Sequence, residues 1–243
     1  MSTTVHFLSA GAAQGVVTAL KGGFEAETGA TLSGRFGAVG AMKEALLAGE
    51  PCDLMIVTDA MVDTLAAAGE LRTGTKLALG RVRTGIAVRA GEPRPDMSTP
   101  EALKAALLAA DALYFPDPQR ATAGIHFASV LQQLGIHDTL QARFRTFPNG
   151  ATAMRELAAS TAPRQIGCTQ ISEILYTEGV QLCGALPDRF ELATVYSAAV
   201  AAAATQPMLA QRFIALLGGP QTQALRTQGG FDVPQTPASS TSR

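Results

Sequence analysis

The chain has 243 residues, of which 47% are hydrophobic and 16% are charged, and its formal net charge is −1. This composition is that of a globular protein and excludes a disordered chain. The neutral charge balance without a basic patch argues against nucleic acid as a partner. No run approaches the 18 or so apolar residues of a membrane-spanning helix, so we expect no membrane insertion.

The first residues, MSTTVHFLSAGAAQG, contain no basic segment, apolar segment or cleavage site typical of a secretory signal. We therefore expect a cytoplasmic protein, or a periplasmic one if the chain is a trimmed mature form. Three cysteines, Cys52, Cys168 and Cys183, have no spacing typical of a disulfide framework or a metal site. They are expected to be buried thiols in a reducing compartment.

Short apolar runs alternate along the chain with segments of helical periodicity. Apolar residues repeat with helical spacing at 16–24, 42–47, 124–134 and 209–217. Ser98-Thr99-Pro100-Glu101 is a strong helix start, because it combines a capping residue, a proline for the first turn and an acid for the helix dipole. Strands are expected at 4–9, 54–58, 85–88, 112–115, 165–168 and 195–201.

The alternation of strands and helices predicts an α/β fold with mainly parallel sheets. Extended segments at 79–89 and 191–200 are the expected crossings between two lobes. The first lobe would be discontinuous and comprise residues 1–82 and 194–232, and the second lobe would comprise residues 83–193. The remainder, 233–243, is rich in Pro, Ser and Thr and is expected to be a mobile tail.

Residues 33–59 are the most informative segment for function. The small-residue turn FGAVGA, at 36–41, is followed by an expected helix that ends near Gly49 and then by a short apolar strand. Such a turn leaves backbone N–H groups free at a helix N-terminus. This arrangement predicts a site for a small anion.

The order of several motifs resembles the molybdate-binding class of type II periplasmic solute-binding proteins. These motifs are FEAETG at 24–29, FGA at 36–38, AGEPCDL at 48–54, Asp117-Pro118 and AGI at 123–125. Each motif is weak alone, but their shared order covers nearly the whole chain. The resemblance implies a two-lobed α/β fold with a ligand cleft between the lobes.

In that family, serine hydroxyls and backbone N–H groups bind an oxyanion in the cleft. The two serine positions correspond to Ala12 and Val39 here, and the position of the family's tyrosine corresponds to Gln170. Only Ala123 can keep the role that the family gives its position, because that role is to donate a backbone N–H and needs no side chain. Each charge-assisted donor contributes roughly 1.5–3 kcal/mol, so losing two lowers affinity on the order of 100-fold or more. The resemblance therefore implies a small anionic ligand but argues against molybdate.

Other polar residues near these motifs suit an organic acid. Arg120 can clamp a carboxylate with two hydrogen bonds. The remaining candidate ligand-binding residues are glycines that allow close approach and polar residues that can donate; they are Gly11, Gly40, Thr122, Asn149, Gly150, Thr169 and Gln170. Each has a purely structural alternative: Arg120 as a solvated loop residue, Thr122 as a helix cap, and the glycines as turn residues.

Catalysis would require a proton carrier, and His126 is the candidate because it lies in the first turn of a cleft helix. His6 and His137 are expected to be structural. No Ser-His-Asp set, G-x-S-x-G, P-loop or metal-ligand cluster is evident, so no cofactor or metal is expected. Aconitate isomerase, which resembles the molybdate-binding family in fold, needs only carboxylate clamps and proton carriers, and Arg120 and His126 are the candidate catalytic residues.

Two functions remain open. The first is a cofactor-independent isomerase or tautomerase that acts on a di- or tricarboxylate in the interlobe cleft and resembles aconitate isomerase. The second is a non-catalytic solute-binding protein for molybdate-like oxyanions or organic acids, either a transporter receptor or an intracellular sensor. A protein-interaction module has little support from this composition. The ligand and the oligomeric state stay undetermined.

Overall fold

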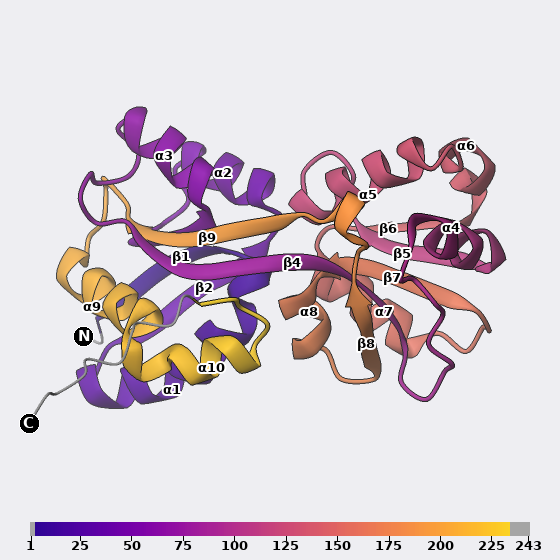
Figure 1. Cartoon of the computed structure of the whole chain (residues 1–243). Helices are drawn as coiled ribbons and strands as arrows, with labels where there is room; N and C mark the ends of the chain where they lie inside the picture. The colour runs from indigo at the N-terminus through magenta and orange to yellow at the C-terminus, as the bar shows by residue number, and fades with distance from the viewer. Residues whose placement is uncertain (1–2, 234–243) are drawn as a thin grey trace, which may run out of the picture.

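The computed structural model describes residues 3–233. One mixed nine-stranded sheet runs through the molecule in the order β2-β1-β3-β9-β4-β7-β5-β6, with β8 also paired to β4. Figure 1 shows two halves, each with strands flanked by helices, joined by the long strand β4 and the segment that leads into β9. The two-lobed α/β fold expected from the sequence is confirmed. Of the expected tail, residues 234–243 lie outside the described residues.

The first lobe contains both ends of the described chain. Its elements are β1 (Thr4–Ala10), η1 (Gly11–Ala13), α1 (Gln14–Thr28), β2 (Thr31–Gly37), α2 (Val39–Leu47), β3 (Leu54–Thr58), α3 (Asp59–Ala67), the start of β4 (Leu77–Arg89), β9 (Ala193–Val200), α9 (Pro207–Gly218), η4 (Pro220–Thr222) and α10 (Gln223–Gln228). A large apolar core lies between its strands and helices, including Phe24, Met55 and Phe213.

The second lobe is built from the middle of the chain. Its elements are the end of β4, α4 (Pro100–Ala109), β5 (Ala112–Pro116), α5 (Thr122–Gln133), α6 (His137–Leu140), η2 (Gln141–Arg143), β6 (Phe144–Phe147), α7 (Gly150–Ala159), β7 (Gln165–Gln170), α8 (Ile171–Tyr176), β8 (Val180–Ala185) and η3 (Asp188–Phe190). It has a separate apolar core, in which Phe115 and Phe127 pack edge to face.

Strand β4 connects the two lobes by changing its partners. Residues up to Arg83 pair with β9, whereas residues from Thr84 onward pair with β7, and from Gly85 onward with β8 as well. All of these pairings are antiparallel, as is the pairing of β3 with β9. The expectation of mainly parallel sheets was therefore wrong, because β4 and β9 pair antiparallel with all of their partner strands. The lobe boundaries at 82/83 and 193/194 stay a prediction.

Local sequence explains how several of the helices begin. The Thr99 hydroxyl accepts a hydrogen bond from the Ala102 N–H at 3.1 Å, and Pro100 follows it, which confirms the helix start expected there. In contrast, α2 and α5 follow Ala38 and Ala121, which have no side chain that can cap a helix. Their first N–H groups are therefore left for other partners.

No helix within residues 3–233 combines the length and the apolar character that a membrane crossing requires.

Candidate anion-binding cleft

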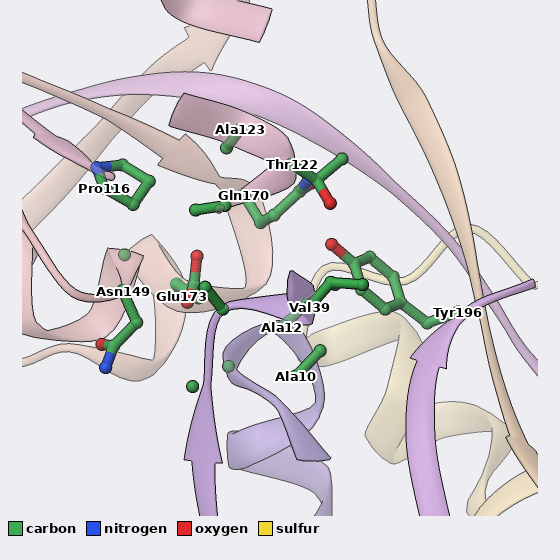
Figure 2. A pocket seen from close by; sticks show the side chains of 15 residues that line it. Ala10, Ala12, Val39, Pro116, Thr122, Ala123, Asn149, Gln170, Glu173 and Tyr196 are labelled. Carbon is green, nitrogen blue, oxygen red and sulfur yellow. The ribbon is translucent and has the colours of Figure 1, made fainter. Parts of the chain in front are cut away.

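A small cavity lies where the two lobes meet. It has a volume of about 20 Å³, about the room that one water molecule needs. Figure 2 shows side chains from both lobes converging on it. The cavity is lined by Ala10, Gly11, Ala12, Gly37, Ala38, Val39, Pro116, Ala121, Thr122, Ala123, Asn149, Gly150, Gln170, Glu173 and Tyr196.

Several helices begin at the cavity wall. The first residues of α2, α5 and α7 are Val39, Thr122 and Gly150, and all three line the cavity. Because helix N-termini present free N–H groups and a partial positive charge, these three ends favour an anion between them. The α7 end is partly capped, since the Asn149 side chain accepts a hydrogen bond from the Thr152 N–H at 2.9 Å.

Glu173 brings a carboxyl group to this cavity from α8. The residue is 5% exposed, and its Oε2 accepts a hydrogen bond from the Thr169 hydroxyl at 2.5 Å. The N–H groups of Gly150, Ala151 and Gln170 also donate to it, yet burial outweighs these bonds and raises the pKa of the carboxyl. The N-terminus of α7 is thus occupied by an acid of the protein itself.

Tyr196 supplies a phenol from β9, on the other side of the cavity. Its hydroxyl points toward that of Thr122, as Figure 2 shows, so the two groups face each other across the lobes. Burial raises the pKa of Tyr196 above its ordinary value. The phenol therefore stays protonated and can donate a hydrogen bond to a ligand in the cavity.

The Gln170 side chain lies in the cavity wall without hydrogen bonds. It is 2% exposed, and within the described part of the chain neither its amide nitrogen nor its amide oxygen has a partner. Buried polar groups are nearly always paired, so this amide offers a donor and an acceptor to a ligand or a water molecule in the cavity.

Comparisons with known proteins agree with this geometry. The profile of a family described as bacterial extracellular solute-binding protein matches residues 5–232. The chain belongs to this solute-binding family. Its resemblance to solute-binding proteins, expected from the motif order, is confirmed.

The proteins that are similar in sequence to this chain include one named as an enzyme. An aconitate isomerase from a Pseudomonas species is 26% identical over 97% of the chain and 90% of its own length. The periplasmic molybdate-binding protein of Azotobacter vinelandii has the same fold, with a TM-score of 0.77 at 20% identity over 95% of this chain and 100% of that one. The sulfate-binding protein SubI of Mycobacterium tuberculosis H37Rv gives a TM-score of 0.72 at 19% identity over 94% and 86% of the chains.

Most of the residues proposed from the sequence come together in this solute-binding fold. Those that line the cavity are Gly11, Ala12, Val39, Thr122, Ala123, Asn149, Gly150 and Gln170. Thr169 lies behind the cavity wall, where its hydroxyl holds Glu173. Its contact with any ligand would be indirect.

Arg120, Gly40 and His126 lie outside the cavity lining. The Arg120 guanidinium is exposed and forms an ion pair with Glu44 of α2, while the Arg120 carbonyl accepts a hydrogen bond from the Gly40 N–H at 3.1 Å. His126 Nε2 is 2.7 Å from the Phe190 carbonyl oxygen, so its ring is engaged within the second lobe. The candidate role of His126 as a proton carrier stays a prediction.

Two cavity residues with ionisable side chains, Glu173 and Tyr196, were not proposed from the sequence. Glu173 had a signal, because it is an acid inside the apolar segment ISEILY that follows Gln170 directly. Tyr196 had none, since it lies in an apolar strand far along the chain from every cleft motif. Within residues 3–233, no group of three or more His, Cys, Asp or Glu is placed to hold a metal ion.

Proposed function

We propose that this protein is a cofactor-independent isomerase that moves a proton and a C=C bond within a small unsaturated organic acid. The observation that carries the proposal is the buried Glu173 carboxyl in the cleft, held beside three helix N-termini and an unpaired amide. A group with a raised pKa is suited to exchange a proton near neutral pH.

The chemistry needs one proton carrier and a site for negative charge. Glu173 as carboxylate removes a proton from the carbon next to the double bond, and the electrons of that C–H bond form the new double bond. The old double bond shifts its electrons toward the substrate carboxylate, giving a dienolate. The protonated Glu173 then returns the proton to the other end of the allylic system, so the step balances without an oxidant, reductant or metal.

The cavity wall is suited to stabilise the dienolate. The residues that begin α2 and α5, Val39 and Thr122, line the cavity and carry backbone N–H groups, and the Tyr196 hydroxyl and the Gln170 amide are further donors in its wall. Donors that are already oriented toward the place where charge develops lower the barrier, and removing one costs on the order of 100-fold in rate.

The two serine hydroxyls of the molybdate-binding motif are replaced by Ala12 and Val39, which argues against a receptor for molybdate-like oxyanions. The relative named aconitate isomerase, similar over 97% of the chain, supports an enzyme. The alternative, a non-catalytic solute-binding protein for organic acids or oxyanions, is supported by the family match over residues 5–232.

Turnover of aconitate tests the proposal. The protein is incubated with trans-aconitate in D₂O, and ¹H NMR follows both the appearance of an isomer and the exchange of the allylic proton. We expect turnover in the wild type and a loss of at least about 100-fold in kcat for Glu173→Gln. Glu156→Gln, an exposed acid on the neighbouring α7, is the matched control and should keep wild-type activity.

A thermal-shift series provides the opposing outcome. Molybdate, sulfate and a panel of unsaturated di- and tricarboxylates are each added to the protein. If molybdate raises the melting temperature strongly and no acid in the panel is bound or converted, the isomerase proposal is wrong and the oxyanion receptor replaces it.

A further inference from the structure

We propose that Glu44 is a built-in substitute for a substrate carboxylate: it holds Arg120 in the ligand-free protein and gives way to a second carboxylate of the substrate. The inference rests on the proposed function to the extent that the cleft must bind an organic acid. It goes further by requiring a substrate with at least two carboxylates, one inside the cavity and one at its mouth.

The position of Arg120 is fixed by contacts between the lobes. Arg120 directly precedes Ala121 and Thr122, which line the cavity. Its carbonyl oxygen accepts a hydrogen bond from the Gly40 N–H, one residue after the cavity residue Val39. Glu44 lies one helical turn further along α2, and its carboxylate binds the Arg120 guanidinium. The ion pair therefore joins the two lobes, and each of its residues follows or precedes cavity-lining residues on the same element or loop.

The charge inside the cavity explains why a cation at its mouth matters. Among the cavity-lining residues that the structure describes, none is a lysine or an arginine, and one, Glu173, is an acid. Helix N-termini and neutral donors can hold one carboxylate there. A second carboxylate finds no cation in the cavity lining, and Arg120 offers it a planar pair of donors.

The present partner of Arg120 is easily displaced. Glu44 and Arg120 have side chains that are 56% and 52% exposed, and ion pairs with this exposure contribute little to stability. Exchanging the Glu44 carboxylate, which accepts one hydrogen bond from Arg120, for a substrate carboxylate keeps the guanidinium paired with a carboxylate. Glu44 thus competes with the substrate for Arg120 while the lobes are closed without ligand.

Isothermal titration calorimetry with tricarballylate tests the inference. This saturated tricarboxylate has no double bond to move, so binding is measured without turnover. We expect Arg120→Gln to weaken binding tenfold or more and Glu44→Gln to strengthen it about two- to fivefold, the range set by a weak exposed pair. In the Arg120→Gln background, Glu44→Gln should give no gain, because no arginine remains to be released.

Glu50→Gln is the matched control. Glu50 forms an exposed ion pair with Arg35 in the first lobe, outside the cavity lining, so this variant changes the net charge by the same amount. It should leave the affinity within about 1.5-fold of wild type. Equal gains for Glu44→Gln and Glu50→Gln would reduce the effect to net charge and overturn the inference.

The remaining outcomes separate this inference from the proposed function. The inference about Glu44 and Arg120 is overturned if Arg120→Gln binds tricarballylate with unchanged affinity. It is also overturned if no variant binds tricarballylate. The expected pattern in the binding cycle together with no proton exchange in aconitate would support the exchange at Arg120 and overturn only the isomerase.

Discussion

At the scale of a single residue, opposing effects act on the ionisation of the Glu173 carboxyl. Three backbone N–H groups and the Thr169 hydroxyl stabilise its charged form, while full burial favours the neutral form and raises the pKa. Its neighbours leave little room, since a Cβ on Gly11 would lie 2.2 Å from Oε1 and one on Gly150 would lie 2.0 Å from Oε2. Only glycine at these two places lets the backbone approach the carboxyl so closely.

The raised pKa predicts how stability depends on pH. Because the folded protein holds the Glu173 proton to a higher pH than the unfolded chain does, the free energy of unfolding falls as pH rises from the ordinary value of 4.5 through the folded pKa. Glu173→Gln removes this titration. The melting temperature of the variant minus that of the wild type should therefore increase with pH over this window, measured by calorimetry. A difference that stays constant or decreases would contradict a raised pKa.

Gly150→Ala tests the tight packing around the carboxyl. The added methyl group would lie 1.9 Å from Thr169 Oγ1 and 2.0 Å from Glu173 Oε2, so the neighbours must move. We expect a loss of about 1–3 kcal/mol in the free energy of unfolding, measured by urea denaturation. Gly184→Ala is the control, because no atom lies within 4 Å of its new methyl group. Similar losses in both variants would contradict the packing argument.

The motif positions predicted much of the cavity wall but not its acid. Gly11, Ala12, Val39, Ala123 and Gln170 line the cavity. These positions could be predicted because turns before helices are encoded locally. The contact of Glu173 with Gly11 depends on how α8 packs on the first lobe, which no local pattern encodes. Arg120 was expected at the ligand for its residue type, whereas its observed partner depends on the position of α2.

At the scale of elements, Asp53 joins parts of the first lobe that are far apart in sequence. It is 1% exposed and precedes β3. Its carboxylate accepts hydrogen bonds from the N–H groups of His6, Thr205 and Gln206 at 2.7, 2.6 and 2.7 Å and from the Thr205 hydroxyl at 3.1 Å. The start of α9 is thereby fixed to the central strands.

Asp53→Asn should destabilise the fold strongly. An amide nitrogen would face donors that need an acceptor, and hydrogen bonds to a charged group contribute about 1.5–3 kcal/mol each. We expect a loss of about 2–4 kcal/mol in the free energy of unfolding, measured by urea denaturation. Asp111→Asn, which removes an exposed partner of Arg164, should cost less than about 1 kcal/mol. Equal costs would show that the buried carboxylate does not fix α9.

The elements themselves were predictable where local signals are strong. The buried strand Leu54–Thr58 and the capped start of α4 were confirmed because apolar runs and caps are local. No strand was expected at β6 or β8, because Phe144–Phe147 and Val180–Ala185 have weak apolar alternation. Neither segment contains a fully buried residue in the structure. Both form strands through their neighbours, since β8 pairs with β4 and β6 pairs with β5.

At the scale of the whole molecule, the two lobes are in contact around a cavity of about 20 Å³. An organic acid with several carboxylates is larger than the single water that this volume holds. The order of motifs predicted the two lobes, but the closed arrangement follows from contacts such as that of Gly40 with Arg120, which no motif encodes. Binding therefore requires the lobes to separate, and the ligand then favours closure by touching both.

A reversible disulfide between the lobes tests this requirement. A Cβ built on Gly40 lies 3.6 Å from the Cβ of Arg120, within the range of about 3.5–4.5 Å found in disulfides. In the double variant Gly40→Cys/Arg120→Cys, oxidation should hold the lobes closed and slow the association of tricarballylate at least about tenfold, measured by stopped-flow fluorescence of a dye on the second lobe. Reduction should restore the rate of the unoxidised double variant.

The unoxidised double variant is the reference, because it lacks the Arg120 side chain equally and differs only in the bond. The single variants, treated with the same oxidant, account for reactions of Cys52 and Cys183, which are half-buried. Mass spectrometry of the digested protein identifies the linked peptides. If the oxidised and reduced forms bind at the same rate, the ligand enters without separation of the lobes, and the contact between Gly40 and Arg120 is not a gate.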